Sequence, residues 1–269
     1  MNGVPKIKVG MDKEKDKDLF IKFLNHSFFP QHRNLILKAF PKLKNLLEDL
    51  EEKEAINNFV DDFYNFYQKE ILKIIRESKL EIKEKSEESL RKLGKAMNYE
   101  WKEPITYLAK ATVLPFSPYE SNVFYFSILA QLKGGESKNL IQISLHEISH
   151  FIFLEQLREL NIKMEKEVRY CFKEALTVAI LNQIGFKSTA NPGVRELKVR
   201  FNDKDYELVD FISKLLKEKK YKKALKEAIN LVNKSSNEFS QKISLWNKYG
   251  KDIIENKEAL KRLREPIKL

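Results

Sequence analysis

Residues 141–154 read IQISLHEISHFIFL, a pattern typical of a buried helix with a histidine pair at its centre. An α-helix brings positions four apart onto one face, so His146 and His150 can direct imidazole nitrogens at one metal ion. Glu147 lies beside them, where a carboxylate can take a proton from water at the ion's open coordination position. Chance is the alternative explanation, and with 4 histidines in 269 residues it produces this pattern only about 0.01 times per chain.

Apolar residues surround the histidine pair on nearly every side of the predicted helix, which indicates that the helix is buried. They are Ile141, Ile143, Leu145, Ile148, Phe151, Ile152, Phe153 and Leu154. Buried histidine and glutamate side chains need partners, and a metal ion supplies one. We therefore expect a catalytic metal site, with a degenerate or structural metal site as the alternative.

A third protein ligand has to be a carboxylate, because no histidine follows His150. Glu165, Glu167 and Glu174 lie on the next predicted helix. If the two helices run antiparallel about a turn near Asn161, His150 lies 11 residues before the turn and Glu174 lies 13 after it. Glu167 lies only 6 residues after the turn. At a helical rise of ~1.5 Å per residue, it is displaced from His150 by about 7 Å along the helix axis. Glu174 also lies in an apolar run, where an unpaired carboxylate is costly, so it is the favoured ligand.

A His-Glu-x-x-His helix followed by a second helix with Glu174-Ala175-Leu176 resembles the gluzincin metallopeptidases. That resemblance implies that His146, His150 and Glu174 bind Zn²⁺ and that Glu147 is the general base of peptide-bond hydrolysis. Segment 122–125 is similar to the cleft-side edge strand of these enzymes, to which a peptide or protein substrate can add as a further strand. An ordinary core strand is the alternative for that segment. The Gly-x-Met-Glu-Asn signature of the large aminopeptidase family is absent.

Gluzincins commonly use a downstream histidine or tyrosine to stabilise the oxyanion, and this chain has no such histidine. The tyrosines that remain as candidates are Tyr170, Tyr206, Tyr221 and Tyr249. Each is also explained as a packing residue at the boundary of an amphipathic helix, because a tyrosine has an apolar ring and a polar tip. The sequence does not rank them.

The sequence after Pro104 changes in character and predicts a small sheet followed by two helices. Segments 105–114 and 122–132 are rich in Thr, Val, Ile, Tyr and Phe and are bounded by proline and glycine, as strands are. The His-Glu-x-x-His helix is expected to run from an N-cap at Ser137 to about Glu159. The second helix is expected to end before Gly185, which suits the position after a helix.

We therefore expect an α+β fold that is mostly helical, with three regions. A zincin-like core over 104–185 contains the small sheet, packed on the His-Glu-x-x-His helix, and the helix that carries Glu174. A helical N-terminal region, 1–103, precedes this core. A helical C-terminal region, 186–269, follows it and contains one strand at 195–201.

The formal net charge is +11, and segment 195–269 carries 20 Lys and Arg against 12 Asp and Glu. These lysines fall on the polar sides of amphipathic helices, where a solvated face is the ordinary outcome. No nucleic-acid recognition signature accompanies them, so nucleic acid is not a favoured partner. The alternative function is still a basic nucleic-acid- or partner-binding protein whose zinc site is structural or vestigial.

The number of cysteines and the hydropathy of the chain indicate the cellular compartment of the protein. The single cysteine, Cys171, excludes an intramolecular disulfide framework and fits a reducing compartment. The first 18 residues have no apolar signal core, and no stretch is long and apolar enough to span a bilayer. We expect a cytoplasmic enzyme with no membrane partner. A latent enzyme, in which the residues before Pro104 cover the cleft, is a further hypothesis.

Overall fold

The computed structural model of the chain describes residues 3–27, 31–101, 105–135, 139–250, 253 and 255–269. Its described part is mostly helical with two small sheets, which confirms the α+β prediction. The chain forms two compact units, one of Met1–Leu90 with Trp101–Glu147 and one of Arg91–Glu100 with Ile148–Leu269. Among the described residues, no helix has the length and apolar character needed to cross a membrane. The predicted helix cap, Ser137, lies outside the described residues.

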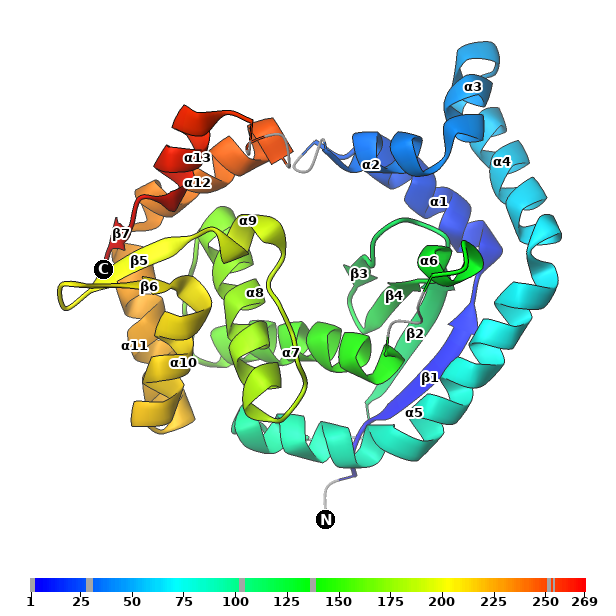
Figure 1. The fold of residues 1–269 in the computed structure, drawn as a ribbon. Helices are drawn as coiled ribbons and strands as arrows, with labels where there is room; N and C mark the ends of the chain where they lie inside the picture. The colour runs from blue at the N-terminus through cyan, green and yellow to red at the C-terminus, as the bar shows by residue number, and fades with distance from the viewer. Residues whose placement is uncertain (1–2, 28–30, 102–104, 136–138, 251–252, 254) are drawn as a thin grey trace. The chain divides into compact units, whose positions relative to one another are not determined.

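The first unit contains a four-stranded sheet in the order β1-β2-β4-β3, visible in Figure 1. Three of the strands run parallel, and β3 runs antiparallel to β4. The strands are β1 (Lys6–Met11), β2 (Thr106–Thr112), β3 (Tyr119–Glu120) and β4 (Val123–Ser127). The helices are α1 (Lys13–Leu24), α2 (Gln31–Ala39), α3 (Pro41–Asp49), α4 (Glu52–Phe66), most of α5 (Gln68–Ala96), α6 (Leu129–Leu132) and the start of α7 (Leu140–Glu159).

Strand β1 was not predicted, because its region was expected to be helical. It pairs in parallel with β2, with Ile7 opposite Tyr107 and Val9 opposite Ala109. Lysines alternate with Ile7 and Val9 along this strand, and alternation of polar and apolar residues is the ordinary strand signal. The predicted N-terminal region therefore contributes a strand to the sheet of the predicted core.

Strand β4 lies inside the sheet, so the prediction that segment 122–125 is an edge strand is wrong. It is paired with β2 on one side and β3 on the other. The backbone N–H of Tyr125 donates to the carbonyl of Pro118, the residue before β3, at 2.8 Å. The backbone hydrogen bonding along this edge of β4 therefore continues beyond the two residues of β3. The strand predicted over 122–132 is also too long, because β4 ends at Ser127 and the short helix α6 begins at Leu129.

A buried carboxylate, Asp16 of α1, joins three elements of the first unit. Its side chain is 1% exposed and accepts hydrogen bonds from the Tyr64 hydroxyl (2.8 Å), the Thr112 hydroxyl and the Val113 backbone N–H (3.0 Å). Burial raises the pKa of Asp16 from 3.8 to about 6, although the three donors favour its ionised form. This carboxylate therefore ties α1 to α4 and to the end of β2.

Asp16→Asn is expected to change how stability depends on pH. The folded protein holds the Asp16 proton more tightly than the unfolded chain, because the pKa is raised on folding. Stability from this group therefore increases as pH falls through 6 and is lost as pH rises. The free energy of unfolding of wild type minus that of the variant should grow by about 1 kcal/mol between about pH 7.5 and 5. Urea unfolding at both pH values measures it, and a constant difference contradicts the expectation.

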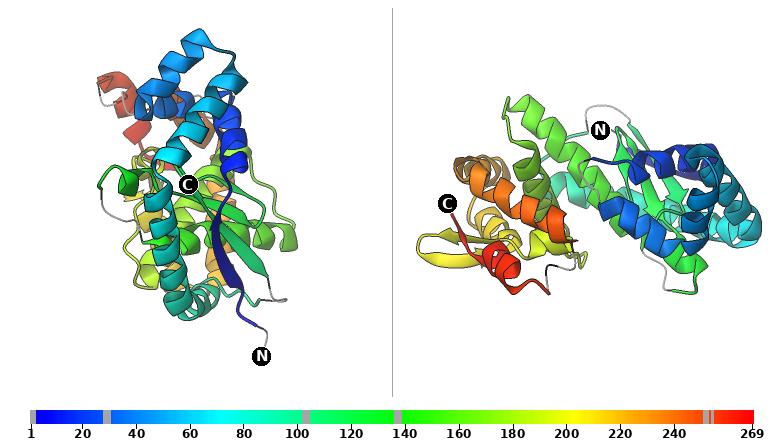
Figure 2. Two further views of the ribbon diagram at one scale, coloured as in Figure 1. Left: turned by 90° about the vertical axis from the view of Figure 1, so that its right-hand side faces the viewer. Right: turned by 90° about the horizontal axis from the view of Figure 1, so that it is seen from above.

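The second unit contains a three-stranded sheet in the order β6-β5-β7. Figure 2 shows the described residues of this unit from Lys198 onward in yellow to red, with α12 beside α13. The strands are β5 (Lys198–Phe201), β6 (Lys204–Glu207) and β7 (Ile267–Lys268). The helices, besides the end of α5 and most of α7, are α8 (Lys166–Gln183), α9 (Pro192–Arg195), α10 (Leu208–Glu218), α11 (Tyr221–Lys234), α12 (Ser236–Tyr249) and α13 (Lys257–Arg264).

The turn that separates α7 from α8 lies where the sequence predicts it. Asn161 has a positive φ of 49°, a conformation that asparagine tolerates better than most residues. Gly185 follows α8 with a φ of 92°, a value that requires glycine. The strand predicted over 195–201 begins later, because Arg195 ends the short helix α9.

Candidate metal centre

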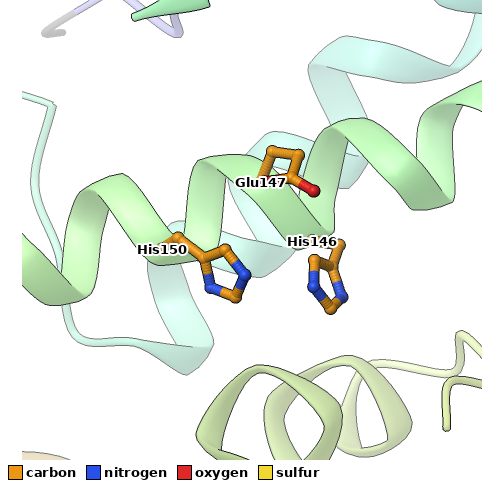
Figure 3. Close-up of side chains that lie close together, drawn as sticks. All are labelled: His146, Glu147 and His150. Carbon is orange, nitrogen blue, oxygen red and sulfur yellow. The ribbon is translucent and has the colours of Figure 1, made fainter. Parts of the chain in front are cut away.

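The three residues of the His-Glu-x-x-His motif lie together on the continuous helix α7, as Figure 3 shows. Ligand atoms of His146, Glu147 and His150 all lie within 4.8 Å of one another. The two imidazole rings project from the same side of the helix, one turn apart. His146 is half-buried, whereas Glu147 is 6% and His150 1% exposed. The cluster therefore consists of two nitrogen donors and one carboxylate, largely withdrawn from solvent.

The ring of His150 is fixed by a different residue at each nitrogen. Its Nε2 lies 3.2 Å from Oε1 of Glu174 on α8, and its Nδ1 lies 3.0 Å from the Thr177 hydroxyl oxygen. Two ligand atoms on one tetrahedral zinc ion, each about 2.1 Å from it, lie about 3.4 Å apart. The spacing of Nε2 and Oε1 therefore fits two neighbouring ligands of one ion.

Thr177 connects His150 to a second buried hydroxyl, that of Ser149, at 2.5 Å. Both hydroxyl residues are buried, Thr177 at 2% and Ser149 at 0% exposed. With Nε2 facing a metal, Nδ1 carries the ring proton and donates it to Thr177, which sets the tautomer and the ring orientation. This pair of hydroxyl groups was not predicted from the sequence. The sequence did contain a sign of Thr177. It is the one hydroxyl residue in the otherwise apolar run 175–181, three positions after Glu174.

The carboxylate of Glu174 has a buried lysine as a second neighbour. Nζ of Lys173 lies 3.2 Å from Oε1, the same oxygen that faces His150. Lys173 is 5% and Glu174 8% exposed, so this ion pair is largely withdrawn from water. Nζ also lies 5.8 Å from the centre of the Tyr170 ring. Lys173 was not predicted as part of the site, although a lysine next to an apolar run on a buried helix is an unusual feature.

The other two carboxylates considered as ligands lie at the start of α8. Glu165 is exposed at the N-cap position, and Glu167 is half-buried in the first turn. Glu174 is buried in the middle of the helix beside His150. Of the three carboxylates, the structure places Glu174 in contact with a residue of the motif.

Tyr170 is the one of the four candidate tyrosines that lies on α8. It shares a face of this helix with Lys173 and Glu174, three and four positions further along. Its hydroxyl oxygen accepts a hydrogen bond of 2.7 Å from Nδ2 of Asn191. Oδ1 of Asn191 accepts from the backbone N–H of Val194 at 3.0 Å, which sets the orientation of the amide. The Tyr170 hydroxyl is therefore the acceptor in its hydrogen bond with Asn191.

The other three tyrosines lie on other elements of the second unit. The Tyr221 hydroxyl donates to Oε1 of Gln156 at 2.8 Å, and burial raises its pKa. Tyr206 of β6 borders a surface hollow of about 380 Å³ together with Asp210. Tyr249 ends α12, and the Lys248 ammonium lies 5.1 Å from its ring centre.

No protein-family model matches the chain, and neither curated proteins nor solved structures give a significant match. The likeness to gluzincins therefore rests on the residues themselves, which are His146, Glu147, His150 and Glu174. Their donor types suit zinc, since imidazole nitrogen and carboxylate oxygen are both common zinc ligands.

Proposed function

We propose that this protein is a zinc-dependent metallopeptidase of the gluzincin type, with His146, His150 and Glu174 as metal ligands. The observation that carries the proposal is the 3.2 Å spacing between Nε2 of His150 and Oε1 of Glu174. These two atoms come from different helices and have the separation of neighbouring ligands on one ion. Two histidines and one carboxylate leave a coordination position open, which is typical of catalytic zinc rather than structural zinc.

The proposed reaction is hydrolysis of a peptide bond. Zinc, when bound, would lower the pKa of a water molecule and polarise the carbonyl of the scissile bond. Glu147 would accept a proton from that water as the water oxygen bonds to the carbonyl carbon. It would return this proton to the leaving amine as the carbon–nitrogen bond breaks. The Tyr170 hydroxyl would donate a hydrogen bond to the oxyanion that develops on the former carbonyl oxygen.

Elemental analysis of the purified protein tests the metal site. We expect stoichiometric zinc in the wild type and none in the double variant His146→Ala, His150→Ala. His26→Ala is the matched control, because it removes a histidine from outside α7, and it should retain zinc. Circular dichroism establishes that each variant is folded. Stoichiometric zinc in the folded double variant would refute the assignment of the ligands.

The alternative function, a basic nucleic-acid- or partner-binding protein, is supported by one observation. A surface hollow of about 610 Å³ lies on the second unit, and most of its lining is basic or apolar. The lining residues are Leu160, Lys222, Lys223, Lys226, Glu227, Asn230, Leu231 and Lys234. Binding of DNA or RNA that weakens steeply with salt, in a protein without peptidase activity, would favour this function.

A further inference from the structure

The ammonium of Lys173 is buried and forms an ion pair with Glu174. It lies 3.2 Å from Oε1 of Glu174, and the two side chains are only 6% and 11% exposed. An ammonium withdrawn from water is costly unless an opposite charge compensates it, and the same holds for the carboxylate. In the metal-free chain each group therefore supplies the charge that the other needs.

This ion pair uses the oxygen that the proposed metal site needs. Oε1 of Glu174 lies 3.2 Å from Nε2 of His150 and also 3.2 Å from Nζ of Lys173. A divalent cation held by Oε1 and Nε2 would share this oxygen with a positively charged group. Two like charges on one buried oxygen repel strongly, because little water screens them. Binding of the metal and pairing with Lys173 therefore oppose each other.

In the position in which it pairs with Glu174, the ammonium also lies near an aromatic ring. Nζ is 5.8 Å from the centre of the Tyr170 ring, within the range in which an aromatic face attracts a cation. The hydrogen bond from Asn191 holds the Tyr170 hydroxyl. The lysine stem is long and flexible, so Nζ can leave the carboxylate and remain over this ring.

We propose that Lys173 is the counter-ion of Glu174 in the metal-free protein and competes with the metal for this carboxylate. The proposal rests on the proposed function, because it assumes that Glu174 is a metal ligand. It gives Lys173 two effects of opposite sign. The ammonium stabilises the metal-free fold, and it weakens zinc binding below what the ligands alone would give.

Zinc affinity and thermal stability of Lys173→Met test this proposal. Methionine has a similar length and no charge, so it removes both the competing cation and the ion pair with Glu174. We expect the variant to bind Zn²⁺ at least about tenfold more tightly, measured by chelator competition at one pH and salt concentration. The thermal midpoint of its metal-free form should fall, and saturating Zn²⁺ should remove most of this difference. Lys166→Met, which removes an exposed charge at the start of α8, should change neither quantity.

Unchanged or weaker zinc binding in Lys173→Met would overturn the proposal, and weaker binding would mean that the ammonium orients Glu174 for the metal. Lys173→Gln is neutral and still able to donate a hydrogen bond, so it must show the same tightening if Lys173→Met does not fold. The proposed function could still hold if the Lys173 proposal fails. It would be supported if the wild type contains zinc and the His146→Ala, His150→Ala variant does not. Absence of zinc from the wild type would overturn both proposals.

Discussion

Replacing Glu147 with glutamine is expected to abolish peptide hydrolysis and to leave zinc bound. The amide has nearly the same size as the carboxylate, so the packing of α7 should be kept. It has no basic oxygen that takes a proton from water, and removal of a general base typically lowers turnover about 10²- to 10⁴-fold. Turnover of a fluorogenic peptide mixture and the zinc content of the same preparation measure the two effects.

Two outcomes would contradict this assignment. Equal turnover in Glu147→Gln would remove Glu147 from the mechanism. Loss of zinc together with activity would instead place Glu147 among the ligands, because its carboxylate lies within 4.8 Å of the ligand atoms of both histidines. Glu167→Gln is the matched control on α8, where a half-buried glutamate lies outside the cluster, and it should keep both zinc and turnover.

The helical part of the site was predictable because it depends on local periodicity. The apolar pattern around His146 and His150 predicted a buried helix, and α7 covers the motif. Counting residues from a turn near Asn161 also paired His150 with Glu174, and the structure places these two side chains 3.2 Å apart. Helical rise is nearly constant, so a count of residues becomes a distance along the axis. The count also required the position of the turn, which Asn161 indicated.

The groups around the candidate ligands were not predictable in the same way, because they depend on which faces of two helices meet. Thr177 and Ser149 are short polar residues of a kind found on any helix, and their contact exists only in the folded chain. Asn191 contacts Tyr170 from a loop 21 positions further along the chain, and the periodicity of a helix does not predict such a contact. Lys173 is different, since its place beside an apolar run is a local sign of burial, although no prediction was made for it.

Only part of the sheet was predicted, because some of its strands carry a clear local pattern and others do not. Strand β2 contains the β-branched and aromatic residues that predict strands, whereas β1 is short and half of its residues are lysine or glycine. Parallel pairing joins β1 to a strand about 100 positions away along the chain, with Lys6 opposite Thr106. A local pattern cannot supply a partner at that separation. The interior place of β4 was missed because β3, the strand that covers it, has two residues.

Tyr170→Phe is expected to lower kcat about 10²- to 10³-fold, which is the usual cost of removing one hydrogen-bond donor to an oxyanion. The ring stays in place, so zinc affinity should be unchanged. KM should change little, because the donated hydrogen bond strengthens only as charge develops on the carbonyl oxygen. Steady-state kinetics and zinc titration on the same variant separate these quantities.

Asn191 provides an independent check on the role of Tyr170. Asn191→Ala removes the donor that holds the Tyr170 hydroxyl, so kcat should fall by less than in Tyr170→Phe. The double variant should be no slower than Tyr170→Phe alone, because both changes act through one hydroxyl. Tyr249→Phe, at the end of α12, is the control and should be neutral. Full turnover in Tyr170→Phe would show that the oxyanion is stabilised by another group, and additive losses in the double variant would give Asn191 a separate role.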